Sequence, residues 1–192
     1  MGVDVTTEVL EQATGVFRGV MAGVTPAQLD GATPCASWKV RDLINHVVAG
    51  SFFFAAAARG EDVGGDGSDA PDFAAGDFLA VYDDGVAQAI AAFGAPGVLD
   101  RVLTVPFGQF PGVALMSLAS TDTLTHAWDL AKATGQDTNL APELAEQLLA
   151  GARMAISDEI RGDEPMPFAK ERPCPDGASS ADRLASFLGR TV

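Results

Sequence analysis

The stretch VALMSLASTDTLTHAWDLAKAT, residues 113–134, decides the fold, because it predicts one long helix with polar groups on its inward face. Apolar residues recur along it every three to four positions, and Gly135 follows as a suitable C-terminal residue for a helix. A carboxylate and an imidazole interrupt this apolar face, and they are the feature that needs explaining. The inward stripe consists of Leu115, Leu118, Ala119, Asp122, His126, Leu130 and Ala133.

The same periodicity predicts further helices on both sides of this stretch. Residues 98–110 contain the strand-like segment of the chain and could form a short hairpin or an extended crossover. A Gly- and Asp-rich loop at 60–71 and a proline-rich stretch at 165–175 separate helices. We therefore expect an all-α single domain over residues 1–192, with a tail that packs back onto the bundle. The other helices are expected at about 6–21, 40–59, 72–93, 142–161 and 179–188.

Composition excludes several classes of partner. Twelve Lys and Arg residues against 26 Asp and Glu residues give a net charge of −14, which repels nucleic acid and anionic membranes. The N-terminus lacks the pattern of a secretory signal, and the most apolar run, residues 47–58, is too short to cross a bilayer. We expect a cytoplasmic protein without a membrane or nucleic-acid partner. Cys35 and Cys174 show no C-x-x-C spacing and are expected to be reduced thiols.

The chain contains two histidines, His46 and His126, and each falls within a predicted helix. Asp122 precedes His126 by four residues, so the two side chains project to the same side of their helix, one turn apart. His46 on a second helix could complete a site of two imidazoles and one carboxylate. Three protein ligands would leave a coordination position open, as in catalytic zinc sites.

Several roles stay open on spacing alone. Both histidines could instead be hydrogen-bonded residues at the border of the core. Asp129, three residues after His126, could orient that imidazole or replace Asp122 as the carboxylate ligand. Cys35 could be a further ligand or a nucleophile, although no basic neighbour is evident in the sequence, and a small buried hydrophobe is the simpler interpretation.

Aromatic and basic residues near these segments also have two interpretations. Trp38 and Trp128 could line a pocket, but we expect them to be packing anchors. The Phe run at 52–54 could belong to the core or to the face of a homodimer. Arg41 and Arg59 could meet an anionic thiol or substrate, but we expect them to pair with surface carboxylates.

Three blocks of the sequence resemble one known family. The segment TPCASWKVRDLINH, residues 33–46, resembles the tryptophan-valine-arginine-aspartate-leucine and histidine motif of the mycothiol-dependent maleylpyruvate isomerase N-terminal domain, in the DinB-like metal-binding superfamily. The segment DTLTHAWDLA, residues 122–131, resembles its acid-x-x-x-histidine helix. Residues 183–190, RLASFLGR, resemble the C-terminal ending of its short, single-domain members.

This resemblance implies a DinB-like four-helix bundle that binds a divalent metal, usually Zn²⁺, with Ni²⁺ or Fe²⁺ as alternatives. By position, His46 and His126 become ligands, and Asp122 replaces the glutamate of the isomerase. The implied activity is transfer or isomerisation with a low-molecular-weight thiol such as mycothiol and an electrophilic substrate. The isomerase also has a second domain, for which we expect no room in 192 residues.

Two classes of function therefore remain. The first is a zinc-dependent thiol transferase or isomerase, in which the metal generates a thiolate. An iron enzyme with the same two histidines and one carboxylate is an alternative within this class, although the usual oxygenases of that type are β-barrels. The second class is a non-catalytic bundle that binds a metal or a partner.

Overall fold

The computed structural model describes residues 6–35, 37–64, 71–162 and 168–192. A hairpin occupies the segment where the sequence left hairpin and crossover open: β1 (Val102–Val105) pairs in antiparallel fashion with β2 (Gly108–Pro111). The predicted all-α fold with one short hairpin is confirmed. The described helices are α1 (Glu8–Ala22), α2 (Val40–Arg59), α3 (Phe78–Phe93), α4 (Gly112–Thr134), α5 (Pro142–Ala155) and α6 (Ser180–Phe187).

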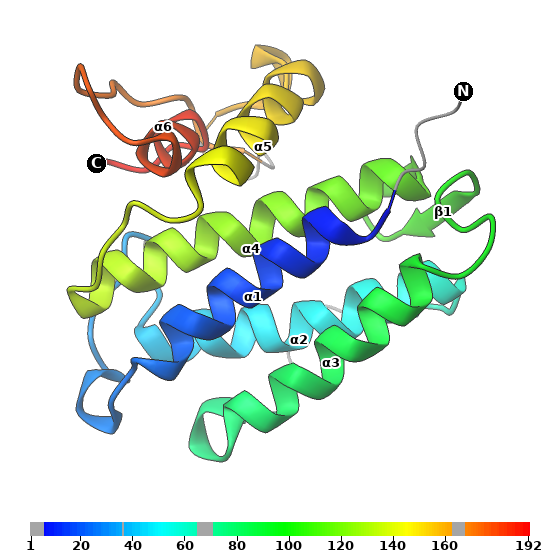
Figure 1. Cartoon of the computed structure of the whole chain (residues 1–192), viewed down its shortest axis with the longest axis horizontal. Coiled ribbons are helices and arrows are strands. Elements are labelled where there is room, and N and C mark those ends of the chain that lie inside the picture. Colours follow the sequence, from blue (N-terminus) through cyan, green and yellow to red (C-terminus); the bar gives the residue numbers. More distant parts are fainter. Residues whose placement is uncertain (1–5, 36, 65–70, 163–167) are drawn as a thin grey trace.

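Helices α1 to α4 form the bundle, and α5 and α6 lie together beyond α4, away from α2 and α3 (Figure 1). Within the bundle α2 packs along α3, α1 packs along α4, and α2 also contacts α4. This last contact brings together the helices that carry the predicted ligands, because α2 carries His46 and α4 carries Asp122 and His126. The hairpin closes one end of the bundle, where Leu103 and Val105 are buried against apolar residues of α2, α3 and α4.

Helix α4 is buried on nearly all sides, which differs from the single inward stripe that the sequence predicted. From Ala119 to Ala131 only Asp122 is less than fully buried. Leu118 and Ala133, which the prediction placed inside, are half-buried. The reason is that α1 and α2 cover one side of α4 while α5 and α6 cover another. A central helix needs no solvated face, so periodicity alone understates its burial.

Two helix boundaries also differ from prediction. The helix expected from residue 72 begins at Phe78, because Asp77 accepts a hydrogen bond from the Ala80 amide and caps it there. The helix expected to reach residue 161 ends at Ala155, since Ile156 adopts an extended conformation. Residues 65–70 of the Gly- and Asp-rich loop and 163–167 beside the proline-rich stretch lie outside the described residues, and the domain extent of 1–192 stays a prediction.

The tail packs back onto the bundle as expected. Trp128 on α4 donates a hydrogen bond from its indole nitrogen to Asp182 on α6, at 2.8 Å. The Arg161 guanidinium donates to the Phe187 carbonyl oxygen at 2.7 Å, at the end of α6. Leu184 and Phe187 are buried in an apolar cluster with α4 and α5. The C-terminal helices therefore share an apolar core with the bundle.

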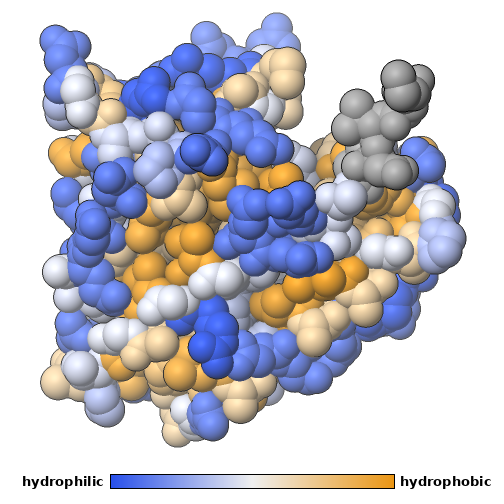
Figure 2. Space-filling view, viewed as in Figure 1, coloured by the Kyte–Doolittle hydropathy of each residue, from blue (hydrophilic) through white to orange (hydrophobic). Residues whose placement is uncertain are grey.

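Hydrophilic side chains cover much of the face shown in Figure 2, with apolar residues in separate groups between them. Among the described residues, every helix is too short or too polar to span a lipid bilayer. Cys35 and Cys174 are free thiols. The Phe52 to Phe54 side chains are half-buried and pack against core residues of the bundle, so the homodimer stays a prediction.

Candidate metal centre

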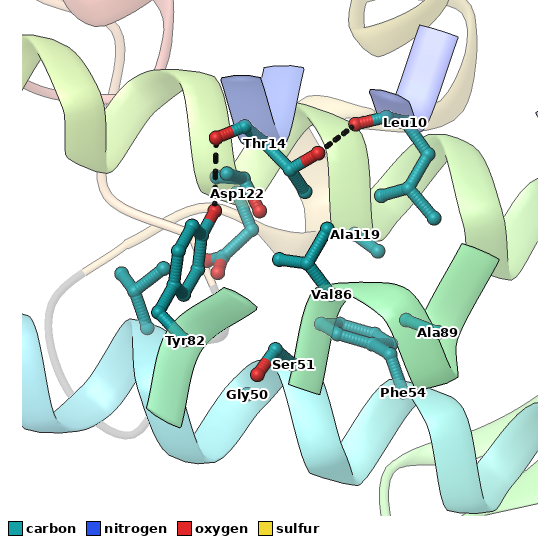
Figure 3. Close-up of a pocket in the computed structure, with 12 residues that line it drawn as sticks. Leu10, Thr14, Gly50, Ser51, Phe54, Tyr82, Val86, Ala89, Ala119 and Asp122 are labelled. Atoms are coloured by element: carbon teal, nitrogen blue, oxygen red, sulfur yellow. Dashed lines mark hydrogen bonds between the residues drawn. The ribbon is translucent and has the colours of Figure 1, made fainter. Parts of the chain in front are cut away.

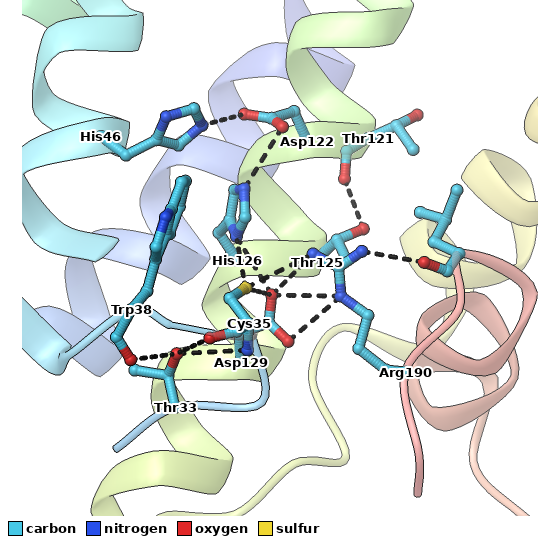
Figure 4. Close-up of polar contacts among 11 residues, drawn as sticks. Thr33, Cys35, Trp38, His46, Thr121, Asp122, Thr125, His126, Asp129 and Arg190 are labelled. Carbon is cyan, nitrogen blue, oxygen red and sulfur yellow. Dashed lines mark hydrogen bonds and ion pairs between the residues drawn. The ribbon is translucent and has the colours of Figure 1, made fainter. Parts of the chain in front are cut away.

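The three side chains predicted as ligands lie together between α2 and α4 (Figure 4). The Nε2 atom of His46 lies 3.7 Å from Oδ2 of Asp122, and the Nε2 atom of His126 lies 3.4 Å from Oδ1 of the same carboxylate. The potential ligand atoms of the three residues all lie within 4.8 Å of one another. Residues 76 positions apart in the sequence thus meet because α2 and α4 pack side by side.

The two nitrogen atoms of His126 face different carboxylates. Its Nε2 atom faces Asp122, whereas its Nδ1 atom lies 3.0 Å from Oδ2 of Asp129. Asp129 is fully buried, one turn further along α4 on the side away from His46. Of the two roles that the sequence left open for Asp129, this geometry fits orientation of the imidazole, and the position beside His46 belongs to Asp122.

Arg190, from the segment after α6, balances the buried charge of Asp129. Its Nη2 atom lies 2.9 Å from Oδ2 of Asp129, and its Nε atom lies 3.3 Å from both carboxylate oxygens. The Cys35 thiol donates to the same Oδ2 atom at 3.1 Å and lies 3.7 Å from Nη2 of Arg190. No basic neighbour of Cys35 is evident in the sequence, because the residue that supplies it, Arg190, lies 155 positions away.

Trp38 forms one wall of the site. Its ring centroid lies 4.7 Å from that of His46 and 5.8 Å from that of His126, and the two imidazoles lie edge to face at 4.9 Å. Trp38 therefore limits how far either imidazole can turn. Trp128, in contrast, faces the C-terminal helices and is a packing anchor as predicted.

The site combines two aspartates whose pKa values are lowered with a histidine whose pKa is raised. Burial would raise the pKa of Asp122, but the charges and hydrogen bonds of His126 and His46 outweigh burial and hold it well below its ordinary value. Burial would lower the pKa of His126, but Asp122 first, then Asp129 and Cys35, raise it well above 6.5. For Asp129, burial is outweighed by His126 and Arg190, which lower its pKa.

One side of the site is open to solvent. The side chains of His46 and Asp122 are 42% and 35% exposed, whereas that of His126 is 7% exposed. Beside Asp122, a small cavity of about 20 Å³ lies between α1, α2, α3 and α4, enough for one water molecule (Figure 3). A small molecule can therefore approach the His46 and Asp122 side, while the His126 side is closed by protein.

The donor set fits a divalent metal ion. Two imidazole nitrogens and a carboxylate oxygen are ligands that Zn²⁺ accepts, and tetrahedral ligands at about 2.1 Å from Zn²⁺ lie about 3.4 Å apart. Each imidazole nitrogen faces a different oxygen of Asp122, at 3.4 and 3.7 Å, and the three ligand atoms lie within 4.8 Å of one another, so the donors surround one point. Cys35, His126 and Asp129 form a second group with metal-binding residue types. That group fits a cation poorly, because the positively charged Arg190 guanidinium already contacts both Cys35 and Asp129.

The role of Arg190 beside Asp129 was not predicted from the sequence, although Arg190 belongs to the C-terminal block, residues 183–190. The available signal was Asp129 itself, since an acid three residues after His126 on a buried helix face requires a counter-charge. The expectation that Arg41 and Arg59 pair with carboxylates is confirmed. Arg59 pairs with Glu61, and Arg41 pairs with Asp30 and Asp72.

A family model described as the mycothiol maleylpyruvate isomerase N-terminal domain matches residues 10–131. The chain belongs to this family. The matched range contains His46, Asp122, His126 and Asp129, and it ends before Arg190. The family resemblance drawn from residues 33–46 and 122–131 is therefore confirmed, whereas the third block, residues 183–190, lies outside the matched range.

The chain is also similar to two mycobacterial proteins and, in fold, to two solved structures. The chain is 42% identical over 184 residues to an uncharacterized protein of Mycobacterium tuberculosis strain H37Rv, across 95% of this chain and 96% of the relative, and it matches the uncharacterized protein of strain CDC 1551 equally well. The crystal structure of the mycothiol-dependent maleylpyruvate isomerase is 19% identical, with a TM-score of 0.64. A histidine-to-alanine variant of that enzyme gives 17% identity and a TM-score of 0.60, over 88% of this chain and 83% of the variant.

The isomerase likeness shows the fold and corrects one expectation. It covers the whole of this chain and 93% of the isomerase chain. We expected no room in 192 residues for the second domain of the isomerase, and a likeness over 93% of that chain does not agree with this expectation. The segment with α5 and α6 lies within the range over which the two folds are similar.

Proposed function

We propose that this chain is a divalent-metal-dependent enzyme that uses a low-molecular-weight thiol, of the mycothiol kind, for transfer to or isomerisation of an electrophile. His46, Asp122 and His126 would be the ligands, with Zn²⁺ as the preferred metal and Ni²⁺ or Fe²⁺ as alternatives. The proposal depends on one observation: two imidazole nitrogens from different helices approach the two oxygens of one half-exposed carboxylate. Family membership supports a thiol-dependent reaction.

A divalent metal bound between these ligands would act as a Lewis acid and lower the pKa of a bound thiol. The residues of the chain supply the rest. With a metal bound, Asp129 would accept the Nδ1 proton of a neutral His126 and leave the Nε2 lone pair of that ring available on the side of Asp122. Trp38 covers both imidazoles on one side and keeps water from that face. The exposed edges of His46 and Asp122 leave a path for the thiol and the electrophile.

Aspartate in place of the isomerase's glutamate is compatible with this role. The Asp122 side chain is shorter by one methylene, yet its carboxylate still lies within 3.7 Å of both imidazoles. Helix α2 contacts α4, so the shorter carboxylate still reaches the histidine of the neighbouring helix. We therefore expect a three-ligand site here as well.

Metal content and thiol-dependent turnover together test the proposal. Protein purified without an affinity tag is reconstituted with Zn²⁺, Ni²⁺ or Fe²⁺ and analysed for bound metal, beside His46→Ala and His126→Ala variants. We expect about one Zn²⁺ per wild-type chain and a large loss in both variants. Asp84→Asn, at an exposed carboxylate of α3, serves as the matched control and should retain metal.

The remaining alternatives give different results. A wild-type protein that binds no metal after reconstitution contradicts both enzyme hypotheses. Preferred, redox-active iron would favour the iron enzyme. Bound Zn²⁺ without turnover of electrophiles in the presence of mycothiol would favour the non-catalytic metal-binding bundle.

A further inference from the structure

We propose that Arg190 is a positioning residue for the metal site and that it couples docking of the C-terminal segment to metal affinity. The proposal rests on the metal site of the proposed function. It adds that a residue outside the matched family range, and outside contact with the ligand atoms, determines how well His126 binds the metal.

The first step is the contact between Arg190 and Asp129. Three contacts of 2.9 to 3.3 Å join the guanidinium to the carboxylate, in the forked arrangement that arginine provides and lysine does not. Asp129 is fully buried and its other ionisable contacts are His126 and Cys35. Arg190 is thus the permanent positive charge that compensates this carboxylate.

The second step is the contact between Asp129 and His126. The Oδ2 atom that Arg190 contacts is also the atom that faces Nδ1 of His126 at 3.0 Å. A carboxylate on Nδ1 fixes both the tautomer and the orientation of a metal-binding imidazole. If the guanidinium is removed, Asp129 becomes an uncompensated buried charge, which is unfavourable. The carboxylate then no longer holds the His126 ring in place.

The third step is the way in which the chain holds Arg190. Its Nη1 atom donates to the Leu188 carbonyl oxygen at 2.9 Å, so the guanidinium is attached to the turn that ends α6. Arg161 donates to the Phe187 carbonyl oxygen, and the Arg172 amide donates to that of Ser186. Docking of α6 therefore places the guanidinium over Asp129 (Figure 4).

Coupling of this kind is reciprocal. If docking of the C-terminal segment strengthens metal binding, metal binding must strengthen docking by the same factor. The coupling predicts that Zn²⁺ protects the α6 backbone from hydrogen exchange, although no α6 residue supplies a ligand. This second readout is independent of enzymatic activity.

The test measures Zn²⁺ affinity by competition with a chromophoric chelator in the full-length protein. Arg190→Met is expected to weaken the affinity about 10- to 100-fold. Arg190→Lys keeps the charge without the fork, so a smaller loss is expected. Arg183→Met removes the contact between α6 and Glu146 without touching Asp129 and should retain wild-type affinity. Circular dichroism establishes that each variant is folded, and Arg190→Lys replaces Arg190→Met if the latter is not.

A double-mutant cycle tests whether Arg190 acts through Asp129. In the Asp129→Asn background, Arg190→Met should cause little further loss of Zn²⁺ affinity, because the carboxylate through which Arg190 acts is already absent. Additive losses would show that Arg190 acts at the metal by another route. Hydrogen exchange of α6 should slow with Zn²⁺ in the wild type and not in Arg190→Met, and equal slowing in both would contradict the coupling.

These outcomes separate this proposal from the proposed function. A wild-type protein without Zn²⁺ affinity rejects the metal site itself. Normal wild-type affinity together with an unchanged Arg190→Met variant rejects only the positioning role. In that case Arg190 would serve only to neutralise a buried acid.

Discussion

At the scale of single residues, Asp122 is the side chain on which the candidate site depends most. Within the described part of the chain it is the carboxylate that lies within 4 Å of both histidines, and they lower its pKa. Replacing its charge without changing its size separates the role of a ligand from that of a packing residue.

Loss of a residue that orients a metal ligand lowers metal affinity roughly 10- to 100-fold. Because Asp122 is itself a proposed ligand, Asp122→Asn should lower the Zn²⁺ affinity by at least this factor. The amide oxygen is a weaker donor than a carboxylate oxygen, and the site loses its negative charge. Chelator competition measures the affinity, with Asp84→Asn as the exposed control. An affinity equal to that of the wild type would show that Asp122 is not a ligand.

The pH dependence of stability in the metal-free protein follows from the same cluster. The pKa of His126 lies well above 6.5 in the folded state, so its contribution is complete below pH 6.5 and is lost as the pH rises through the folded pKa. The pKa values of Asp122 and Asp129 are lowered, so their contributions are present above pH 3.8 and are lost as the pH falls through the folded values.

We therefore expect the metal-free protein to be most stable between about pH 4 and 6.5 and to lose stability at higher pH. Urea unfolding at a series of pH values in the presence of a chelator measures this dependence. The His126→Gln variant should lose less stability between pH 6.5 and 9 than the wild type. Parallel curves for the two proteins would mean that His126 is not the group responsible.

At the scale of elements, the crossing of α2 and α3 depends on the small size of Gly85. A methyl group on Gly85 would collide with the Ser51 hydroxyl and lie 3.1 Å from the Phe52 ring. Both residues belong to α2, five and six positions after His46. The close approach of α3 thus fixes the position of the part of α2 that follows the proposed ligand His46.

Gly85→Ala should destabilise the protein by about 1–3 kcal/mol, because the two helices must separate or the side chains must leave their preferred rotamers. Gly19→Ala is the matched control, since a methyl group there meets no atom within 4 Å and α1 gains about 0.4–1 kcal/mol. Urea unfolding measures both changes. A Gly85→Ala protein as stable as the wild type would mean that the crossing adjusts without cost.

At the scale of the whole molecule, the C-terminal helices and the four-helix bundle share one core. The cluster that contains Leu144, Leu148 and Leu184 also includes Leu124 and Trp128 of α4 and Ala13 of α1. A boundary between bundle and tail would have to cut through this cluster. We therefore expect the two parts to unfold together.

The Trp38→Phe variant tests this expectation, because Trp128 at the contact of α4 and α6 is then the sole tryptophan. Fluorescence of Trp128 reports tail docking, and far-ultraviolet circular dichroism reports all helices. The two urea transitions should have the same midpoint. A fluorescence change at lower urea would show that the tail separates before the bundle unfolds.

The helices, the hairpin segment, the family and the pair Asp122 and His126 could be predicted from the sequence, because periodicity, short motifs and an i, i+4 spacing are local properties of the chain. The assembly of the site could not be predicted in this way and depends on helix packing. The tertiary structure brought His46 to Asp122, separated the roles of Asp122 and Asp129, and placed Arg190 and Cys35 beside Asp129. These contacts join residues 61 to 155 positions apart. They depend on how helix surfaces pack, which no local pattern specifies.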